Sequence, residues 1–309
     1  EMGQQLVDIG GGQVTTATRS ADGFGEHQLQ GDDNAFGLKV HRLPLPLMGI
    51  HPGTVRESAK ARPAQGQTRA GANEVVNKDG TNFHDSLTIW GYTSNGTELF
   101  DQILLTKVRN WRNSVEWPYG QGANMKFYAV APSLETINML GVGGTYSAPP
   151  MLTYTLPEAA DEMRDVLYGE SENISIASGP AGTTTNNPKQ EHLGKDNKFV
   201  ELQFRHITTA IRFSQGTVPS GLTINSVGVQ GIYSKGDFDP SRDDPQTATK
   251  GVWTNQSTAA SYTLSSVSVT EDENVYIDGG KVLFMIPQTL PDGARLVVKL
   301  TETKTKNGG

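Results

Sequence analysis

Apolar and polar residues alternate along much of the chain, in short runs that fit β-strands. From Met125 to Ala131 an apolar side chain recurs at every second position, and the same alternation runs from Val200 to Phe204. Successive side chains of a strand point to opposite faces of its sheet, so this period predicts strands. Further predicted strands lie at 36–40, 87–91, 207–213, 222–233, 261–269, 275–277, 282–286 and 296–300.

A few stretches depart from this simple alternation. Apolar residues recur three or four positions apart between Phe100 and Val108, which predicts a helical face. Two segments that follow prolines, 133–140 and 158–167, are also predicted to be helical. The apolar parity changes at His206-Ile207, and one extra residue in a strand has this effect, so a β-bulge is predicted there.

The segment 177–197 has no large apolar side chain before Leu193 and is rich in Gly, Pro, Thr and Asn. This composition predicts a linker or a long surface loop between two domains. Many short strands with glycine-rich turns are typical of β-sandwiches, so we predict an all-β fold with short helical insertions. The predicted organisation is a flexible arm at 1–34, an N-terminal sandwich at 35–176 with a strand at 35–47 and a loop at 49–82, the linker at 177–197, and a C-terminal sandwich at 198–309.

Composition narrows the classes of function. The 309 residues suggest two domains, because a domain takes about 150 residues. Cysteine is absent, which excludes disulfides, thiolate metal sites and a cysteine nucleophile. The net charge of −7 and the lack of a Lys/Arg cluster argue against a nucleic-acid partner. The longest apolar runs, such as 282–286, are far shorter than the roughly 18 residues that a membrane-spanning helix needs.

A set of short phrases occurs in one order along the chain. The most specific phrases are Phe204-Arg205-His206 and Ile286-Pro287-Gln288. The other phrases are Trp90-Gly91-Tyr92, Trp111, Trp117-Pro118-Tyr119, the run from Met125 to Pro132, the run from Leu152 to Pro157, and the run from Val227 to Gly236. In this order the phrases resemble the fimbrillin family of Bacteroidales, the subunits of type V pili. The resemblance covers roughly residues 35 to 300.

The resemblance implies two transthyretin-like β-sandwich domains in tandem. It also implies export as a lipoprotein precursor and assembly into fimbriae on the outer membrane at the cell surface. The implied partners are other fimbrial subunits, in a homo- or hetero-polymer, and an arginine-specific processing protease. Host or bacterial surface glycans or proteins are further candidate partners. No cofactor and no enzymatic activity are implied, and membrane contact would come only through a lipid anchor on a removed leader.

In this family, proteolysis removes an N-terminal strand, and a donor strand from a neighbouring subunit takes its place. On this chain the removable strand corresponds to Phe36, Leu38 and Val40. The expected cut lies between Arg69 and Ala70, with Arg19 and Ser20 as the alternative.

The end of the chain departs from the family pattern. Members usually close with a Trp-containing strand, whereas this chain stops at Gly309 soon after the predicted strand at 296–300. The C-terminal sandwich is therefore expected to lack its last strand, which leaves stalk, tip and anchor roles open.

The alternative function is a tip or anchor adhesin that binds carbohydrate, because sugars stack on aromatic faces. Trp90 and Trp111 are the candidate glycan contacts. Alternation places Trp90 on the strand face opposite Leu87 and Ile89, which leaves an exposed position open. Core packing or an interdomain contact is nevertheless the commoner fate of such aromatic residues.

Metal and catalytic motifs are weak in this sequence. The six histidines show no zinc-site spacing, no Gly-x-Ser-x-Gly occurs, and no paired carboxylates lie at matching strand ends. His206 is interpreted as an inward, hydrogen-bonded structural residue. The acidic group from Asp237 to Asp244 is interpreted as a turn, with Ca²⁺ binding as the alternative, because the glycine and terminal glutamate of a calcium loop are missing.

Overall fold

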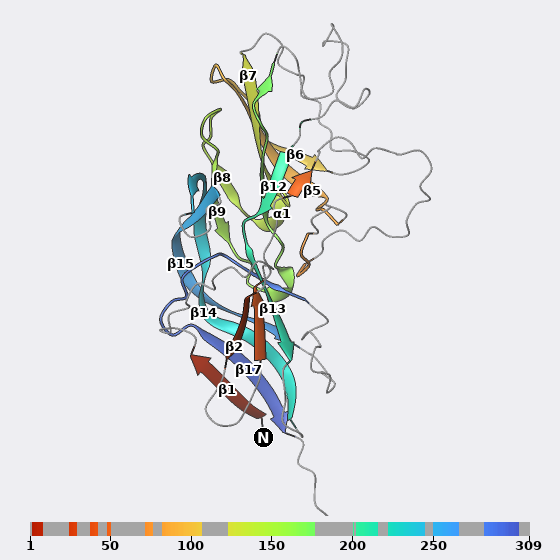
Figure 1. Ribbon diagram of the computed structural model, residues 1–309, viewed down its shortest axis with the longest axis vertical. Helices are drawn as coiled ribbons and strands as arrows, with labels where there is room; N and C mark the ends of the chain where they lie inside the picture. Colours follow the sequence, from red (N-terminus) through yellow and green to blue (C-terminus); the bar gives the residue numbers. More distant parts are fainter. Residues whose placement is uncertain are drawn as a thin grey trace, which may run out of the picture.

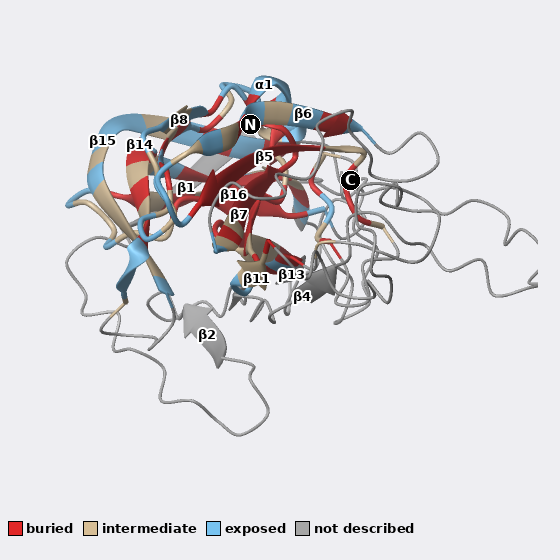
Figure 2. Ribbon diagram, turned by 90° about the horizontal axis from the view of Figure 1, so that it is seen from above, coloured by how far each residue is buried: buried red, intermediate tan, exposed pale blue. Residues whose placement is uncertain are grey.

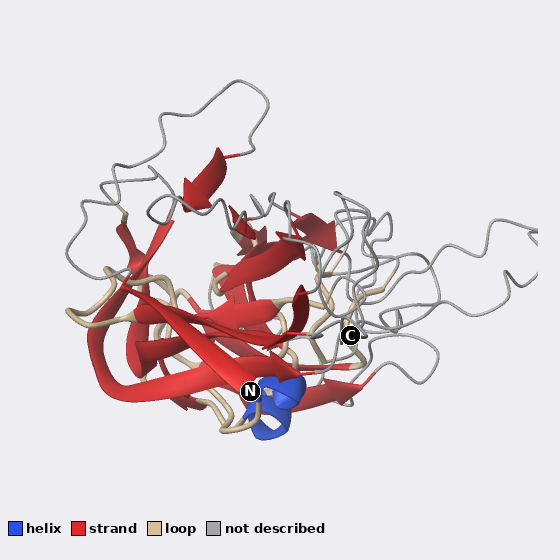
Figure 3. Cartoon of the chain, turned by 90° about the horizontal axis from the view of Figure 1, so that it is seen from below, coloured by secondary structure: helices blue, strands red, loops and turns tan. Residues whose placement is uncertain are grey.

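The structure is a computed structural model of the chain (Figure 1). It describes residues 72–76, 82–106, 123–176, 200, 202–215, 222–244, 250–265 and 281–302, together with the backbone of four strands between residues 2 and 50. Strands dominate the described residues (Figure 3), and helix is limited to α1 (Leu134–Ile137) and a 3₁₀ turn, η1 (Ala160–Glu162). The predicted all-β fold is thus confirmed. Neither described helix has the length and apolar character needed to cross a membrane.

All described strand pairs are antiparallel, and they form three sheets. The strands are β1 (Met2–Asp8), β2 (Gly25–Leu29), β3 (Leu38–Arg42), β4 (Met48–Ile50), β5 (Ser86–Thr93), β6 (Glu98–Thr106), β7 (Asn124–Ala131), β8 (Leu140–Val142), β9 (Met151–Thr155), β10 (Leu167–Glu170), β11 (Ile174–Ser175), β12 (Leu202–His206), β13 (Thr209–Gln215), β14 (Leu222–Asp243), β15 (Lys250–Ser265), β16 (Leu283–Met285) and β17 (Arg295–Glu302).

We name each sheet after a central strand. The β14 sheet has the order β1-β17-β14-β9-β8, and β15 pairs with the other side of β14. The β7 sheet has the order β4-β12-β10-β7-β5-β6, and β11 also pairs with β7. The β13 sheet has the order β16-β13-β3-β2. The β7 sheet lies toward one end of the long axis of the molecule, and the other two sheets lie toward the other end (Figure 1).

The long strand β14 organises its sheet. It runs for 22 residues, and Val227 lies between Val298 of β17 on one side and Leu264 of β15 on the other. Further along, Phe238 lies opposite Leu152 of β9. One strand therefore holds three neighbours in register, and it ties the β8–β9 hairpin to the strands at the end of the chain.

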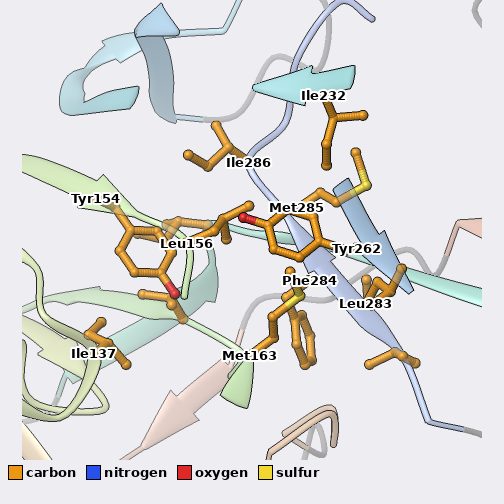
Figure 4. Close-up of a cluster of buried hydrophobic side chains, with 14 of the residues drawn as sticks. Ile137, Tyr154, Leu156, Met163, Ile232, Tyr262, Leu283, Phe284, Met285 and Ile286 are labelled. Carbon is orange, nitrogen blue, oxygen red and sulfur yellow. The ribbon is translucent and has the colours of Figure 1, made fainter. Parts of the chain in front are cut away.

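The main hydrophobic core lies between the β14 and β13 sheets and continues onto one face of the β7 sheet. Phe213 of β13 and Phe284 of β16 are fully buried in it. Figure 4 shows how Tyr154, Met163 and Tyr262, from separate parts of the chain, gather around Phe284. This arrangement is sandwich-like, because two sheets face each other across a shared apolar layer.

Strand β7 is buried on both faces of its sheet. Tyr128 and Val130 point into the main core, whereas Phe127 and Ala129 belong to a second cluster on the other face. The side chains of β7 thus alternate as the sequence predicted, but neither face is left to solvent (Figure 2). A strand buried on both faces carries little polar signal by which the sequence could assign its outer side.

Some local predictions are confirmed and others are wrong. Helix α1 lies within the predicted segment 133–140, but in 158–167 only η1 is helical. The predicted helix at 100–108 is wrong, because β6 pairs there with β5. Gln102 has a left-handed backbone (φ 50°), and β6 carries an extra residue beside it. This bulge interrupts the alternation of β6 and imitates helical spacing.

The predicted bulge at His206-Ile207 is also wrong. Strand β12 ends at His206 in the β7 sheet, and β13 begins at Thr209 in the β13 sheet. The apolar parity changes because the chain crosses from one sheet to another. A crossing of this kind leaves the same sequence pattern as a bulge.

Strands from the two sides of residues 177–197 pair with one another. Gly169 of β10 lies opposite Phe204 of β12, and Tyr154 of β9 lies opposite Gly236 of β14. The segment 177–197 itself lies outside the described residues. Sheets built from both halves of the chain are therefore a feature of this fold.

Candidate functional site: sheet edges covered by the N-terminal strands

The four strands between residues 2 and 50, which we call the N-terminal strands, lie on the outside of all three sheets. Strand β1 pairs with β17, and β4 pairs with β12. Strand β3 pairs with β13, and β2 lies outside β3. None of them lies between two strands of the later chain. The part of the chain from residue 72 onward, which we call the body, is thus bordered by this segment at three edges.

The edge of β13 borders the main core most directly. Phe213, opposite Val40 of β3, is fully buried, and so is Ala210 earlier in the strand. The other neighbour of β13, β16, pairs only with residues 209 to 211. Strand β3 is therefore the described partner of β13 from residue 212 to 215. Without it, the backbone donors and acceptors on that side of β13 would be left without partners.

The body begins with a tightly held residue, Asn73. Its backbone N–H donates to the Met163 carbonyl at 2.8 Å. Its side-chain nitrogen donates to the carbonyl oxygens of Ala160 (2.7 Å) and Val282 (2.8 Å). The Val282 N–H in turn donates to the Asn73 carbonyl at 3.2 Å. Asn73 is 2% exposed and has a left-handed backbone (φ 60°), which asparagine tolerates better than most residues.

A buried polar group fixes the next part of the body. The carboxylate of Asp165 is fully buried and accepts a hydrogen bond from the Val76 N–H at 2.9 Å. Nδ1 of His206 lies 2.9 Å from one oxygen of this carboxylate and 2.8 Å from the other. Three distant segments therefore meet at one carboxylate, at the point where β12 ends and the chain crosses to the β13 sheet.

His84 completes this polar group, which we call the Asp165 cluster. Its Nε2 lies 2.6 Å from the backbone carbonyl of Asp165, so this nitrogen must carry the proton and donate. Burial lowers the pKa of His84 from its ordinary value of 6.5, although the bond to the Asp165 carbonyl and the nearby carboxylates act in the opposite direction. The neutral form of His84 is thus the form that the fold favours.

The structure places the residues predicted to be processed or exchanged as follows. Leu38 and Val40 lie in β3, and Val40 pairs with Phe213. Strand β3 extends from 38 to 42, slightly later than the predicted strand. The remaining predicted processing, exchange and glycan residues lie outside the described residues; they are Arg19, Ser20, Phe36, Arg69, Ala70 and Trp111.

Of the positions left open for Trp90, the structure shows core packing and not exposure. Its side chain is 1% exposed and belongs to the main core. The strand face opposite Leu87 is covered by the β8–β9 hairpin, so the ring offers no face on which a sugar could stack. Gly141 of β8 lies directly over this ring, because a Cβ placed there would lie 2.5 Å from it.

The acidic group at Asp237 to Asp244 lies mostly in β14 and is therefore not a simple turn. Asp237 accepts hydrogen bonds from Thr153 (2.6 Å) and Asn255 (2.8 Å). These bonds, that from Thr153 first, lower the pKa of its carboxyl group. Among the residues that the structure describes, no group of three or more His, Asp or Glu side chains is placed to hold a metal ion.

The sequence did not reveal Asn73 or Asp165. His206 was interpreted as an inward, hydrogen-bonded residue, and its bond to Asp165 confirms this. A usable signal for Asp165 would have been its place between the apolar residues Met163 and Val166, where an unpaired carboxylate is costly. Asn73 has no such signal, because asparagine is common in exposed loops.

In comparisons with known proteins, no family model, curated protein or solved structure matches the chain.

Proposed function

We propose that this chain is a structural subunit of a cell-surface fimbria, and that it assembles by exchange of an edge strand after proteolysis. The observation that carries the proposal is the position of the N-terminal strands, which border all three sheets and separate no two body strands. A segment placed in this way is suited to removal, because its loss would interrupt no pairing within the body.

The exchange uses ordinary strand addition. Removal of β3 would expose the backbone of β13 next to fully buried Phe213. An extended strand from a neighbouring subunit would satisfy the same backbone groups, and its alternate side chains would cover the same core. Each large apolar side chain buried in this way contributes about 1.5–3 kcal/mol before ordering costs. A few such side chains are enough for a durable contact between subunits.

Asn73 supports the expected position of the cut. A chain that begins at Ala70 would keep Asn73 and all four of its hydrogen bonds. The body would then start at a residue that is buried and held at both its backbone and its side chain. Under this proposal the sequence phrases imply two tandem transthyretin-like domains, a lipoprotein precursor, and a position on the outer membrane.

The first test is digestion of the full chain with an arginine-specific protease, followed by determination of the new N-terminus. We expect a stable product that begins at Ala70. Arg69→Lys should prevent this product, whereas the matched variant Arg19→Lys should leave it unchanged. A stable product that still begins before Ala35 would contradict the proposal.

The second test asks whether the trimmed body accepts a strand. A synthetic peptide of residues 35–47 should bind the trimmed body and raise its melting temperature. The same peptide with Val40→Asp should bind much more weakly, because a carboxylate would be placed opposite Phe213. Equal binding of the two peptides, or loss of the body's near-UV circular dichroism on trimming, would argue against strand exchange.

A further inference from the structure

The edge strand β8 differs from the edges that the N-terminal strands cover. Strand β8 pairs with β9 and ends the described order of its sheet. Leu140 is 64% exposed and Val142 is 65% exposed. Met151 lies opposite Val142 on β9 and is 39% exposed. These three apolar side chains, which we call the β8 patch, lie beside a strand edge that pairs with no other described strand.

The position of β8 is fixed by its contacts with the core side chains that it covers. Gly141 faces the core, and a Cβ there would lie 2.5 Å from the Trp90 ring. The side chains on either side of it, Leu140 and Val142, therefore point outward by alternation. The Tyr92 hydroxyl donates to the Gly143 carbonyl at 3.2 Å, just beyond the strand. The β8 patch is thus held on a rigid support.

Two other sheet edges of the body, β6 and β15, carry the usual protection against pairing. Strand β6 has exposed Glu98 and Asp101 and a bulge at Gln102. Strand β15 has exposed Lys250 and two register shifts against β14 in its first half. Charges and bulges of this kind prevent two edges from joining. Strand β8 has no charge, no proline and no register shift against β9.

We propose that the β8 edge is a contact between two copies of this chain, which pair antiparallel through β8 about a twofold axis. The lack of charge at this surface favours a second copy of the chain as the occupant. The chain carries a net charge of −7, yet residues 138–157 contain no Asp, Glu, Lys or Arg. Two copies that meet here bring no like charges together at the contact, and a charged partner would find no counter-charge in the segment.

The pairing is also self-complementary. In an antiparallel pair of identical strands centred on Gly141, Leu140 of one copy lies across from Val142 of the other. Cross-strand apolar pairs of this kind stabilise a sheet, and the same patch serves both copies, as a twofold interface requires. The contact is short, so we expect a weak and reversible dimer, in the range of transient interfaces below about 1,200 Å².

The test uses the full, uncut chain, so it does not depend on strand exchange. Sedimentation equilibrium should show a weight-average mass that rises with concentration toward that of a dimer. Val142→Lys should raise the dimer dissociation constant at least about tenfold, because two ammonium groups would then face one edge. Leu104→Lys is the matched control: Leu104 is 49% exposed on β6, and this variant should associate as the original chain does.

Each other outcome would overturn the inference. The first is a monomer at every concentration up to about 1 mM, at which half of the protomers would be dimeric if the dissociation constant were that large. The second is equal association of Val142→Lys and the original chain. The third is a mass that grows past that of the dimer. The last outcome counts because a twofold edge contact closes after two copies. Circular dichroism of both variants should match that of the original chain, because both substituted side chains are exposed.

Discussion

The N-terminal strands and the strand β14 are held by different means. Strand β14 pairs with β15, β17 and β9, and its apolar side chains belong to the main core. Each N-terminal strand instead borders the body at one edge at most. How firmly a strand is held depends on the number of strands that pair with it and on the number of its side chains in the core. Its length and its alternation alone do not decide this. On this basis we expect the body to tolerate changes in the N-terminal strands far better than changes within itself.

Asp165→Ala should have the largest effect, because it breaks the Asp165 cluster inside the body. The Val76 N–H and Nδ1 of His206 would lose their shared buried acceptor. Each buried donor that loses its partner in this way costs about 1–3 kcal/mol. Urea unfolding monitored by tryptophan fluorescence would measure this loss of unfolding free energy.

Asp239→Ala is the control for this measurement, because Asp239 accepts hydrogen bonds from Ser241 at an exposed position. Its effect should stay below about 1 kcal/mol. If the two variants were equally stable, the Asp165 cluster would not be a main support of the body.

Gly228→Ala should have the second largest effect, because it forces β14 away from β15. A Cβ at Gly228 would lie 2.1 Å from the Tyr262 carbonyl oxygen, which is a backbone atom and cannot rotate away. Such overpacking costs about 1–3 kcal/mol. Thermal unfolding would measure it.

Gly236→Ala, in the same strand, provides the comparison. Its nearest contact would be a side-chain atom of Trp253 at 3.2 Å, so the cost should be smaller. A Gly236→Ala variant that is less stable than Gly228→Ala would mean that β14 is not pinned to β15 at Gly228.

Acid should weaken the body through His84. The folded chain holds the pKa of His84 below 6.5, so the neutral form is favoured by folding. This contribution is complete at pH values above 6.5 and is lost as the pH falls below it, because the unfolded chain then binds a proton that the folded chain resists. We expect the melting temperature to fall between pH 7 and pH 5.

His84→Gln isolates this effect. The glutamine amide can still donate to the Asp165 carbonyl but does not titrate. The variant should therefore show a shallower fall in melting temperature over the same pH range. Parallel curves for the two proteins would remove His84 as the cause.

The sequence predicted the strands better than it predicted their neighbours. Alternation located β5, β7 and β12, because period two is a property of the strand itself. It could not show that the face of β5 that carries Trp90 is covered, which is why exposure and core packing both stayed open for this residue. The coverage comes from the β8–β9 hairpin, which is close to Trp90 only in space.

The candidate site shows the same limit. The family resemblance implied a removable strand at Phe36, Leu38 and Val40, and the structure places Leu38 and Val40 in a strand that pairs with β13. The partners that hold the body together were hidden, because Asn73 lies 209 residues from Val282 and Asp165 lies 41 residues from His206. Contacts over such distances leave no periodic pattern in a single sequence.

Val40→Pro should have the smallest effect on the unfolding of the body, and it tests the comparison most directly. Proline removes the backbone N–H of a paired residue in β3 and disfavours a strand position with neighbours on both sides. If β3 is held separately from the body, the midpoint of urea unfolding should barely change. Amide hydrogen exchange in residues 211–215 should instead speed up about tenfold or more, because these residues pair with β3.

Amides of β7 should keep their protection in the same experiment, since β7 pairs with β5 and β10. Val40→Thr, which retains the N–H and suits a strand, should leave exchange at residues 211–215 close to that of the original chain. If Val40→Pro instead lowered the unfolding free energy as much as Asp165→Ala does, β3 would unfold together with the body. A strand coupled so closely to the body could not be removed or exchanged without unfolding it.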